Sequence, residues 1–268
     1  MTAAANNTPR WVLLNKAAIR YAVSGTRGRP ALLIHEMGGS LESWDPVLEF
    51  IPREQRIIRC DLRGSGGSEK IRGEITCDDL ADDVLELLDH LRITEPVNVT
   101  GVAIGGCTAL RFAARNPERV HRLAPINPPT DAFGRSGEVL RERAKAADAH
   151  GMRAIVESAL ARSYPDFLRE DKERYDAYVA RFLTNDPTSY AHIVRALANI
   201  DFTGVLERIR APTLFLSGRH DLVRRSADIA AITPRVPGAR FLEIDGGHMP
   251  SVQAPAALAK VLTEFFGW

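Results

Sequence analysis

The sequence lacks the features that mark several large classes of protein. Three cysteines in 268 residues, Cys60, Cys77 and Cys107, are odd in number and widely spaced, which argues against a disulfide framework and against a metal site. Lys and Arg number 35 against 34 Asp and Glu, and no block of like charge occurs, so neither a nucleic acid nor a membrane surface is the expected partner. We therefore expect reduced thiols and a small-molecule substrate.

Long apolar runs are also missing. No run approaches the roughly 18 residues that a membrane-spanning helix needs. The first eleven residues, MTAAANNTPRW, lack the charged and apolar regions of a secretory signal. These absences predict a soluble, cytoplasmic protein, and they leave its oligomeric state open.

Short apolar runs alternate with helical patterns along most of the chain. The predicted strands occupy residues 11–14, 18–22, 30–35, 55–61, 97–101, 212–217 and 239–244. The predicted helices between and after them occupy residues 43–50, 78–91 and 254–266. The first two strands resemble an antiparallel pair, and the later alternation predicts the α/β class, with a mostly parallel sheet flanked by helices.

The alternation breaks between residue 128 and about residue 200. This stretch is almost entirely helix-forming, for example over residues 137–149 and 171–183. The run Asn127-Pro128-Pro129 marks the boundary, because proline lacks an N–H donor and restricts the residue before it. We therefore predict a helical cap, residues 128–199, inserted into a sheet domain formed by residues 1–127 and 200–268.

One loop after a predicted strand has the pattern of a sharp turn. Residues 101–106 read Gly-Val-Ala-Ile-Gly-Gly, with glycines two positions on either side of Ala103. Such glycines permit a tight passage from strand to helix, which presents the central side chain above the sheet edge. The backbone N–H of Ile104 then faces the same place. The pattern is that of a nucleophile elbow with alanine at the nucleophile position.

Two later loops supply an acid and a base. Asp221 ends the run Gly-Arg-His-Asp that follows the strand at 212–217, and His248 follows two glycines after the strand at 239–244. We expect Asp221 to orient His248 and to stabilise its charged form. The alternatives are a turn aspartate and a structural histidine.

A fourth segment, residues 35–40 (His-Glu-Met-Gly-Gly-Ser), follows the predicted strand at 30–35. The backbone N–H groups of Met37 and Ile104 are expected to converge where an oxyanion would develop. We expect His35 to order this loop through hydrogen bonds rather than to titrate in the reaction. Glu36 is expected to be a solvated loop carboxylate, with a substrate-facing acid as the alternative.

Several other residues are weaker candidates. Trp44 is a candidate to line the pocket, as aromatic groups often do. Cys107 lies about one helical turn beyond Ala103 and is expected to point into the core, not to replace the nucleophile. Residues 61–68 are expected to be structural, with Asp61 and Arg63 bracing neighbouring loops. The cap offers four further candidates for the pocket wall: Arg141, Tyr164, Tyr190 and His192.

Taken in order, these motifs resemble the α/β-hydrolase superfamily, in its capped esterase, lactonase and carbon–carbon hydrolase branch. The matching segments are His35-x-x-Gly38-Gly39-Ser40, residues 61–68, the elbow at 101–105 and Gly247-His248. The resemblance covers essentially the whole chain and implies a hydrolase that needs neither metal nor organic cofactor, with Asp221 and His248 as two members of a triad. Two positions depart from it: Glu36, where many relatives have Gly, and Ala103, where the nucleophile belongs.

Ala103 leaves two interpretations open, because a methyl group cannot attack a carbonyl and no acyl-enzyme can form there. Either an ordinary serine hydrolase has been altered from Ser to Ala, or the alanine is natural. For the second, the elbow and residues 38–44 resemble the aminoacrylate or carbamate hydrolase of pyrimidine degradation. His248 would then activate water, and general base catalysis, worth about 10²–10⁴-fold, is enough for an activated small ester or lactone, a carbamate or an enamine. A catalytically silent ligand-binding protein is the alternative from another class.

Overall fold

A computed structural model of the chain describes residues 7–130 and 135–268. Residues 1–6 and 131–134, which belong to the predicted sheet domain and the predicted cap, lie outside the described residues. Within the part that is described, no helix combines the length and the apolar content that crossing a bilayer requires.

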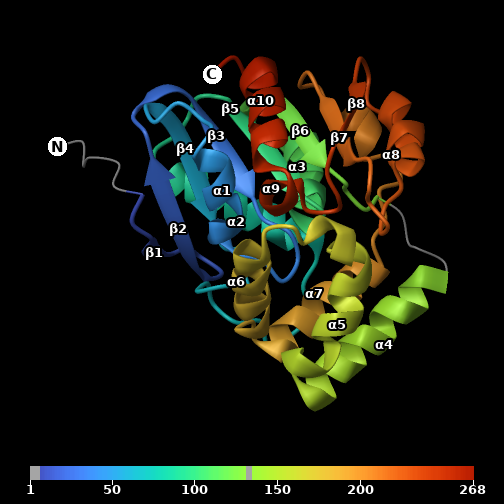
Figure 1. Ribbon diagram of the computed structural model, residues 1–268. Helices are drawn as coiled ribbons and strands as arrows, with labels where there is room; N and C mark the ends of the chain where they lie inside the picture. Colours follow the sequence, from blue (N-terminus) through green and yellow to red (C-terminus); the bar gives the residue numbers. More distant parts are fainter. Residues whose placement is uncertain (1–6, 131–134) are drawn as a thin grey trace.

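Eight strands form one sheet in the order β1-β2-β4-β3-β5-β6-β7-β8 (Figure 1). Their bounds are β1 Arg10–Leu13, β2 Ala18–Ser24, β3 Arg27–Ile34, β4 Gln55–Cys60, β5 Val97–Val102, β6 Val120–Ile126, β7 Leu214–Gly218 and β8 Arg240–Ile244. β2 pairs antiparallel with β1 and with β4, and the remaining neighbours are parallel. The predicted α/β class and mostly parallel sheet are confirmed.

The predicted strands and helices outside the cap are present within a few residues. The strand β6 was not predicted, because the partly exposed His121 and Arg122 interrupt the apolar run near its start. The helix α8, Ser226–Ile232, was also not predicted, because its seven residues span only two turns.

Helices cover both faces of the sheet. Their bounds are α1 Asp45–Leu48, α2 Cys77–His90, α3 Ile104–Arg115, α8 Ser226–Ile232, α9 Pro250–Gln253 and α10 Pro255–Phe266. The core divides accordingly: Leu32 and Ile34 of β3 pack with α2, α3 and α8, whereas Ala31 and Leu33 pack with α1, α9 and α10. Successive residues of a strand point to opposite faces, and all four are fully buried, so β3 lies at the centre of a three-layer structure.

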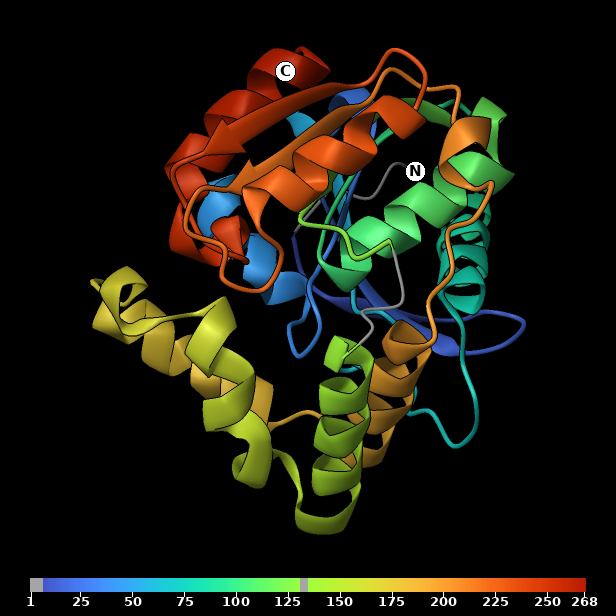
Figure 2. The ribbon, with the colours of Figure 1, turned by 90° about the vertical axis from the view of Figure 1, so that its right-hand side faces the viewer.

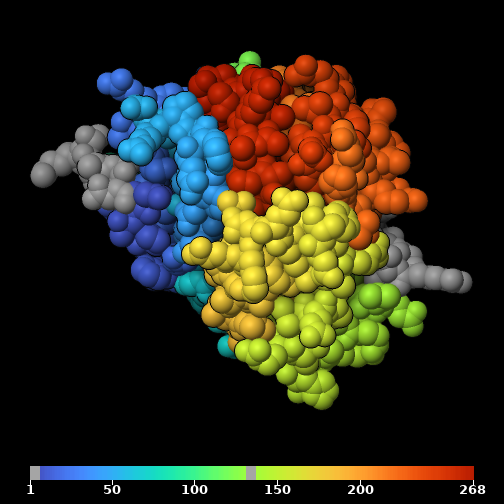
Figure 3. Space-filling view, viewed as in Figure 1, coloured from blue at the N-terminus to red at the C-terminus, as the bar shows by residue number. Residues whose placement is uncertain are grey.

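Four further helices stand between β6 and β7 in the chain: α4 Arg135–His150, α5 Met152–Ser163, α6 Lys172–Leu183 and α7 Pro187–Ala198. We call these helices the cap. Asp171 and Asp186 begin α6 and α7, since each carboxylate accepts a hydrogen bond from the backbone N–H three residues later. The cap lies at one end of the sheet (Figure 2). In the space-filling view its yellow surface lies against the red C-terminal part of the chain (Figure 3).

Candidate active site

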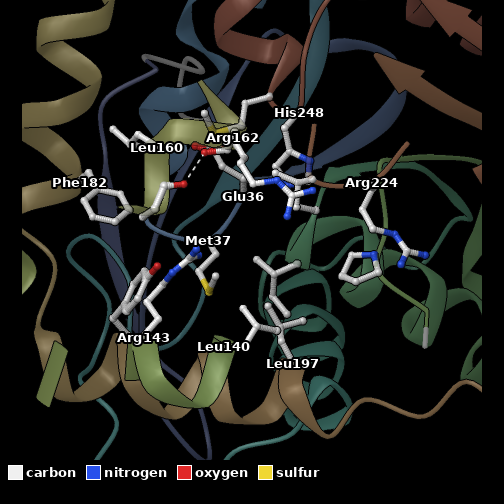
Figure 4. Close-up of a pocket in the computed structure, with 18 of the residues that line it drawn as sticks. Glu36, Met37, Leu140, Arg143, Leu160, Arg162, Phe182, Leu197, Arg224 and His248 are labelled. Carbon is white, nitrogen blue, oxygen red and sulfur yellow. Dashed lines mark hydrogen bonds between the residues drawn. The ribbon is translucent and has the colours of Figure 1, made fainter. Parts of the chain in front are cut away.

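A cavity of about 160 Å³ lies between the carboxyl ends of the parallel strands and the cap (Figure 4). From the sheet domain it is lined by Glu36, Met37, Ala103, Ile104, Pro129, Val223, Arg224, His248 and Met249. From the cap it is lined by Val139, Leu140, Arg143, Ala159, Leu160, Arg162, Ser163, Tyr178, Phe182, Tyr190 and Leu197. The structure thus brings five of the predicted site residues to one cavity, although they follow three different strands.

Ala103 occupies a sharp turn between β5 and α3. Its backbone has φ 51° and ψ −112°, a conformation that an L-residue with a side chain adopts only at a cost. The turn is held by the hydrogen bond from the Ala103 N–H to Ile126 O, at 2.9 Å, and by close packing at the glycines. A Cβ added at Gly101 would collide with the backbone of Gly105, and one added at Gly105 would collide with Ile34 O. The geometry of a nucleophile elbow is therefore complete around a methyl group.

His248 and Asp221 form a buried pair at the same cavity. Nδ1 of His248 lies 2.7 Å from Oδ2 of Asp221. The other carboxylate oxygen, Oδ1, accepts the backbone N–H groups of Val223 at 2.6 Å and Arg224 at 2.8 Å. Because an ionised carboxylate only accepts, Nδ1 must carry the proton, which leaves Nε2 of the neutral imidazole as an acceptor.

Asn127, expected only to mark a domain boundary, ties together the loops that carry this pair. Its side-chain N–H₂ donates to Gly247 O at 3.2 Å and His248 O at 3.0 Å, and its Oδ1 accepts the Gly218 N–H at 3.3 Å. Asn127 is fully buried and has φ 47°. Its position directly after a parallel strand could have identified it as a site residue, but that strand, β6, was not predicted.

The loop after β3 is ordered by His35. Nε2 of His35 accepts the Leu62 N–H at 2.9 Å, so the proton resides on Nδ1, which lies 2.6 Å from Glu36 O. The hydrogen bonds expected for His35 are therefore present. Among the described residues we find no acceptor for the backbone N–H of Met37 or Ile104, and both residues line the cavity. The two N–H groups are available to a ligand there.

Glu36 differs from the expectation. It is 1% exposed and lines the cavity, so the prediction of a solvated loop carboxylate is wrong. The sequence places it in a loop, but the cap closes over that loop, with the ring of Phe182 packed against Gly38. Asn185, just beyond the end of α6, also donates to Gly38 O at 2.9 Å.

Trp44 is also placed differently from the prediction. It is fully buried in the core on the α10 side of the sheet and is absent from the cavity wall, because its short helix turns the indole inward. Of the four cap candidates, only Tyr190 lines the cavity, and Tyr164 is buried against the ring of Tyr178. Arg141 and His192 line a separate groove with Arg111.

Cys107 lies in the core and the segment after β4 is structural, as expected for both. The Cys107 thiol is fully buried, donates to Pro129 O at 2.7 Å, and has a pKa raised by that burial, all of which disfavours a nucleophilic thiolate. Asp61 accepts the N–H groups of Leu41 and Gly67, and Arg63 pairs with Asp83. Both residues brace loops rather than reach the cavity.

The cavity wall carries more positive than negative charge. Arg143 of α4, Arg162 of α5 and Arg224 of the loop after β7 line it, against the single carboxylate of Glu36 among the described lining residues (Figure 4). Burial raises the pKa of the Tyr190 hydroxyl, and the guanidinium of Arg143 beside that hydroxyl opposes the rise. Arg143 therefore reaches into the cavity from α4.

Comparisons with known proteins agree with this geometry. A family model described as alpha/beta hydrolase fold matches residues 30–255. The 3-oxoadipate enol-lactonase 2 of Acinetobacter baylyi is 28% identical over 242 residues, which cover 90% of each chain. A putative carbamate hydrolase RutD of Rhizobium rhizogenes is 32% identical over 200 residues, covering 72% of this chain and 74% of the relative.

Solved structures add a similarity of the whole fold. The enol-lactonase from Burkholderia xenovorans LB400 has a TM-score of 0.89 and 28% identity, and the match covers 97% of this chain and 100% of that one. These matches confirm the predicted superfamily and the branch that contains lactonases.

Proposed function

The chain belongs to the α/β-hydrolase fold family and is a hydrolase related to enol-lactonases and carbamate hydrolases, and we propose that it cleaves a small, labile acyl compound without forming an acyl-enzyme. In this proposal water takes the place of the missing nucleophile. The three residues that carry the reaction are Ala103, which leaves room for the water, and the pair of His248 and Asp221.

The reaction follows from the positions of the protons. Nε2 of His248 takes a proton from water, and the resulting hydroxide attacks the carbonyl carbon. The oxyanion accepts hydrogen bonds from the N–H groups of Met37 and Ile104. When the tetrahedral intermediate collapses, the carbonyl re-forms, the leaving group departs, and His248 returns the proton to it. Asp221 stabilises the imidazolium between these two steps.

The observation that carries the proposal is the conformation of Ala103 beside the His248–Asp221 pair. Holding a non-glycine residue at φ 51° costs on the order of 1–3 kcal/mol. The methyl side chain of Ala103 has no chemical role that would explain this cost. The turn does, however, direct the Ile104 N–H and the first turn of α3 at the cavity. A strained backbone that positions a donor supports an active hydrolase over a silent binding protein.

The chemistry limits the substrate to labile acyl groups. A general base contributes about 10²–10⁴-fold, and one oxyanion donor about 10²–10³-fold. Together these suffice for an activated ester, an enol lactone, a carbamate or an enamine, but not for an amide. The arginines of the wall favour a substrate that carries an anionic group, and we assign its selection mainly to the cap, whose helices α4 and α5 carry Arg143 and Arg162.

The test is hydrolysis by the purified chain with Ala103 in place. We expect turnover of an enol lactone or an aryl carbamate, a loss of about 10²–10⁴-fold in kcat for His248→Ala, and no covalent adduct by intact mass. The variant Ala103→Ser restores a hydroxyl at the elbow and should become reactive toward a fluorophosphonate, which labels activated serines.

Two outcomes would contradict the proposal. Turnover by Ala103→Ser alone would support an ordinary serine hydrolase whose serine had been replaced. Tight binding of these compounds with no turnover by either protein would support the catalytically silent alternative.

A further inference from the structure

The loop of residues 35–40, which we call the oxyanion loop, contains a tight turn. The N–H of Gly39 donates to Glu36 O at 3.1 Å, so Met37 and Gly38 are the two central residues of the turn. Gly38 has φ 81°, a value that glycine adopts freely at the second central position. The peptide group between Glu36 and Met37 enters this turn, and it carries the N–H that we assign to the oxyanion.

The direction of the Met37 N–H depends on what holds Glu36 O. A trans peptide group points its C=O and its N–H in opposite directions. Glu36 O accepts the Gly39 N–H and lies 2.6 Å from Nδ1 of His35, the ring nitrogen that carries the proton. The Met37 N–H therefore points away from both of these donors. Whatever fixes Glu36 O also sets the direction of the oxyanion donor.

The same rule applies to the peptide group between Gly38 and Gly39. Its N–H is the donor to Glu36 O, so its oxygen, Gly38 O, points to the opposite side. On that side Nδ2 of Asn185, a cap residue, donates to Gly38 O at 2.9 Å. A continuous series of hydrogen bonds thus runs from Asn185 through two peptide groups to Met37.

The end of α6 places Asn185 for this contact. The residue is 7% exposed, and its Nδ2 also lies 3.2 Å from Arg181 O and 3.1 Å from Phe182 O. Three carbonyl oxygens surround this nitrogen, so the amide must present its N–H₂ group to Gly38. Phe182, three residues earlier, packs against Gly38 so closely that an added Cβ there would collide with the ring. The cap therefore holds the turn by packing and by a hydrogen bond.

The series of hydrogen bonds affects an oxyanion in two ways. Each bond restrains the direction of the next peptide group. Each also polarises the next group by about 10–30%, because a C=O that accepts a hydrogen bond makes the N–H of its own peptide group a stronger donor. Both effects grow with the negative charge on the substrate oxygen. They therefore stabilise the transition state more than the bound substrate.

We propose that Asn185 is a positioning residue for the oxyanion donor of Met37, acting from the cap through the Gly38–Gly39 and Glu36–Met37 peptide groups. The inference rests on the proposed function for its catalytic form. It deepens that function by making the cap part of the oxyanion site. Because Tyr178 and Phe182 of α6 line the cavity, the same helix contacts the substrate and orients the Met37 N–H.

Steady-state kinetics provide the first test. We expect Asn185→Ala to lower kcat for phenyl acetate by about tenfold, less than the 10²–10³-fold that a whole oxyanion donor is worth, and to change KM by less than about twofold. Asn185→Leu fills the space of the amide without a donor and should behave in the same way. Asn199→Ala is the matched control, because Asn199 is an exposed asparagine at the end of α7, and both constants should stay unchanged. Thermal unfolding checks the fold of each variant.

Two inhibitors separate positioning from packing. Phenyl methylphosphonate carries an anionic, tetrahedral P–O⁻ in place of the oxyanion, whereas acetanilide carries the neutral, planar carbonyl of a bound substrate. Isothermal titration calorimetry gives Kd for each, and the wall arginines contribute equally in wild type and variant. We expect Asn185→Ala and Asn185→Leu to weaken binding of the phosphonate by about tenfold and of acetanilide by less than about twofold.

Equal weakening of both inhibitors, or a raised KM with kcat unchanged, would mean that Asn185 only supports the packing of the cap, which would overturn the inference. Unaltered phosphonate affinity in both variants would overturn it as well. If wild type hydrolyses no ester, the hydrolytic proposal fails, but a loss of affinity confined to the phosphonate would still support the positioning role. A wild type that binds the phosphonate no more tightly than acetanilide has no directed oxyanion donor, and the inference would then be wrong.

Discussion

Replacing Asp221 by asparagine tests the water-activating role of His248 without changing the shape of the site. In the wild type, Oδ1 of Asp221 accepts two backbone N–H groups and Oδ2 accepts Nδ1–H of His248. An amide has one oxygen. If that oxygen keeps the two backbone bonds, the amide N–H₂ faces Nδ1, which must then accept, and the imidazole proton moves to Nε2. His248 can then no longer take a proton from water.

The magnitude follows from the alternative orientation. Turning the amide so that its oxygen faces His248 restores the productive tautomer but opposes N–H₂ to the N–H groups of Val223 and Arg224. Two hydrogen bonds to a carboxylate are worth about 1.5 kcal/mol each, so the productive form is disfavoured by roughly 3 kcal/mol, about 100-fold. We expect kcat to fall by about 100-fold at least and by about 10⁴-fold at most, the full contribution of a general base.

The assay is the initial rate of phenol release from an aryl ester or carbamate, with folding checked by thermal unfolding. Asp245→Asn is the matched control, because Asp245 also pairs with a histidine, His220, with 3.0 Å between Oδ1 and Nε2, but at the exposed surface. It should leave kcat within about twofold, since surface ion pairs contribute little. If Asp221→Asn kept more than a tenth of the activity, the assigned tautomer and the base role of His248 would be refuted.

Three further predictions concern stability. Ala103→Gly should change the free energy of unfolding by less than about 1 kcal/mol, because relief of about 1–3 kcal/mol of backbone strain offsets the lost methyl and the greater freedom of the unfolded glycine. Ala109→Gly in α3, where no strain is relieved, should cost about 2 kcal/mol, and urea denaturation compares the two variants. Asn127→Ala should cost about 3 kcal/mol in the same assay and lower kcat, since three loop groups lose their partner; an unchanged midpoint would contradict this. Burial alone would raise the pKa of Glu42, but hydrogen bonds from Arg20 and Ser40 hold it at about 2. Its stabilisation is therefore complete above its ordinary pKa of 4.5 and is lost as the pH falls through 2. Thermal unfolding should show Glu42→Gln less stable than wild type at neutral pH, with the difference shrinking as the pH falls from 4.5 through 2; a constant difference across that window would argue against this.

The parts of the molecule that follow from local chemistry were predictable. Strand and helix periodicity depends on the side chains alone, so every strand of the sheet except β6, and the helix from Cys77, were expected at nearly their observed bounds. The elbow was expected because only glycine fits beside the backbone at positions 101 and 105. Because close backbone contact requires glycine on both sides of residue 103, the turn there could be predicted from the sequence.

The sequence alone determined which chemical groups the site holds and in what order the chain supplies them, including the missing nucleophile at Ala103. Only the tertiary structure decided that Glu36 is buried, that Trp44 lies in the core, and that Asn127 joins three loops. The physical reason is that burial and hydrogen-bond partners depend on segments distant in the chain. The cap closes over Glu36 from more than 100 positions away, and no local pattern records that contact.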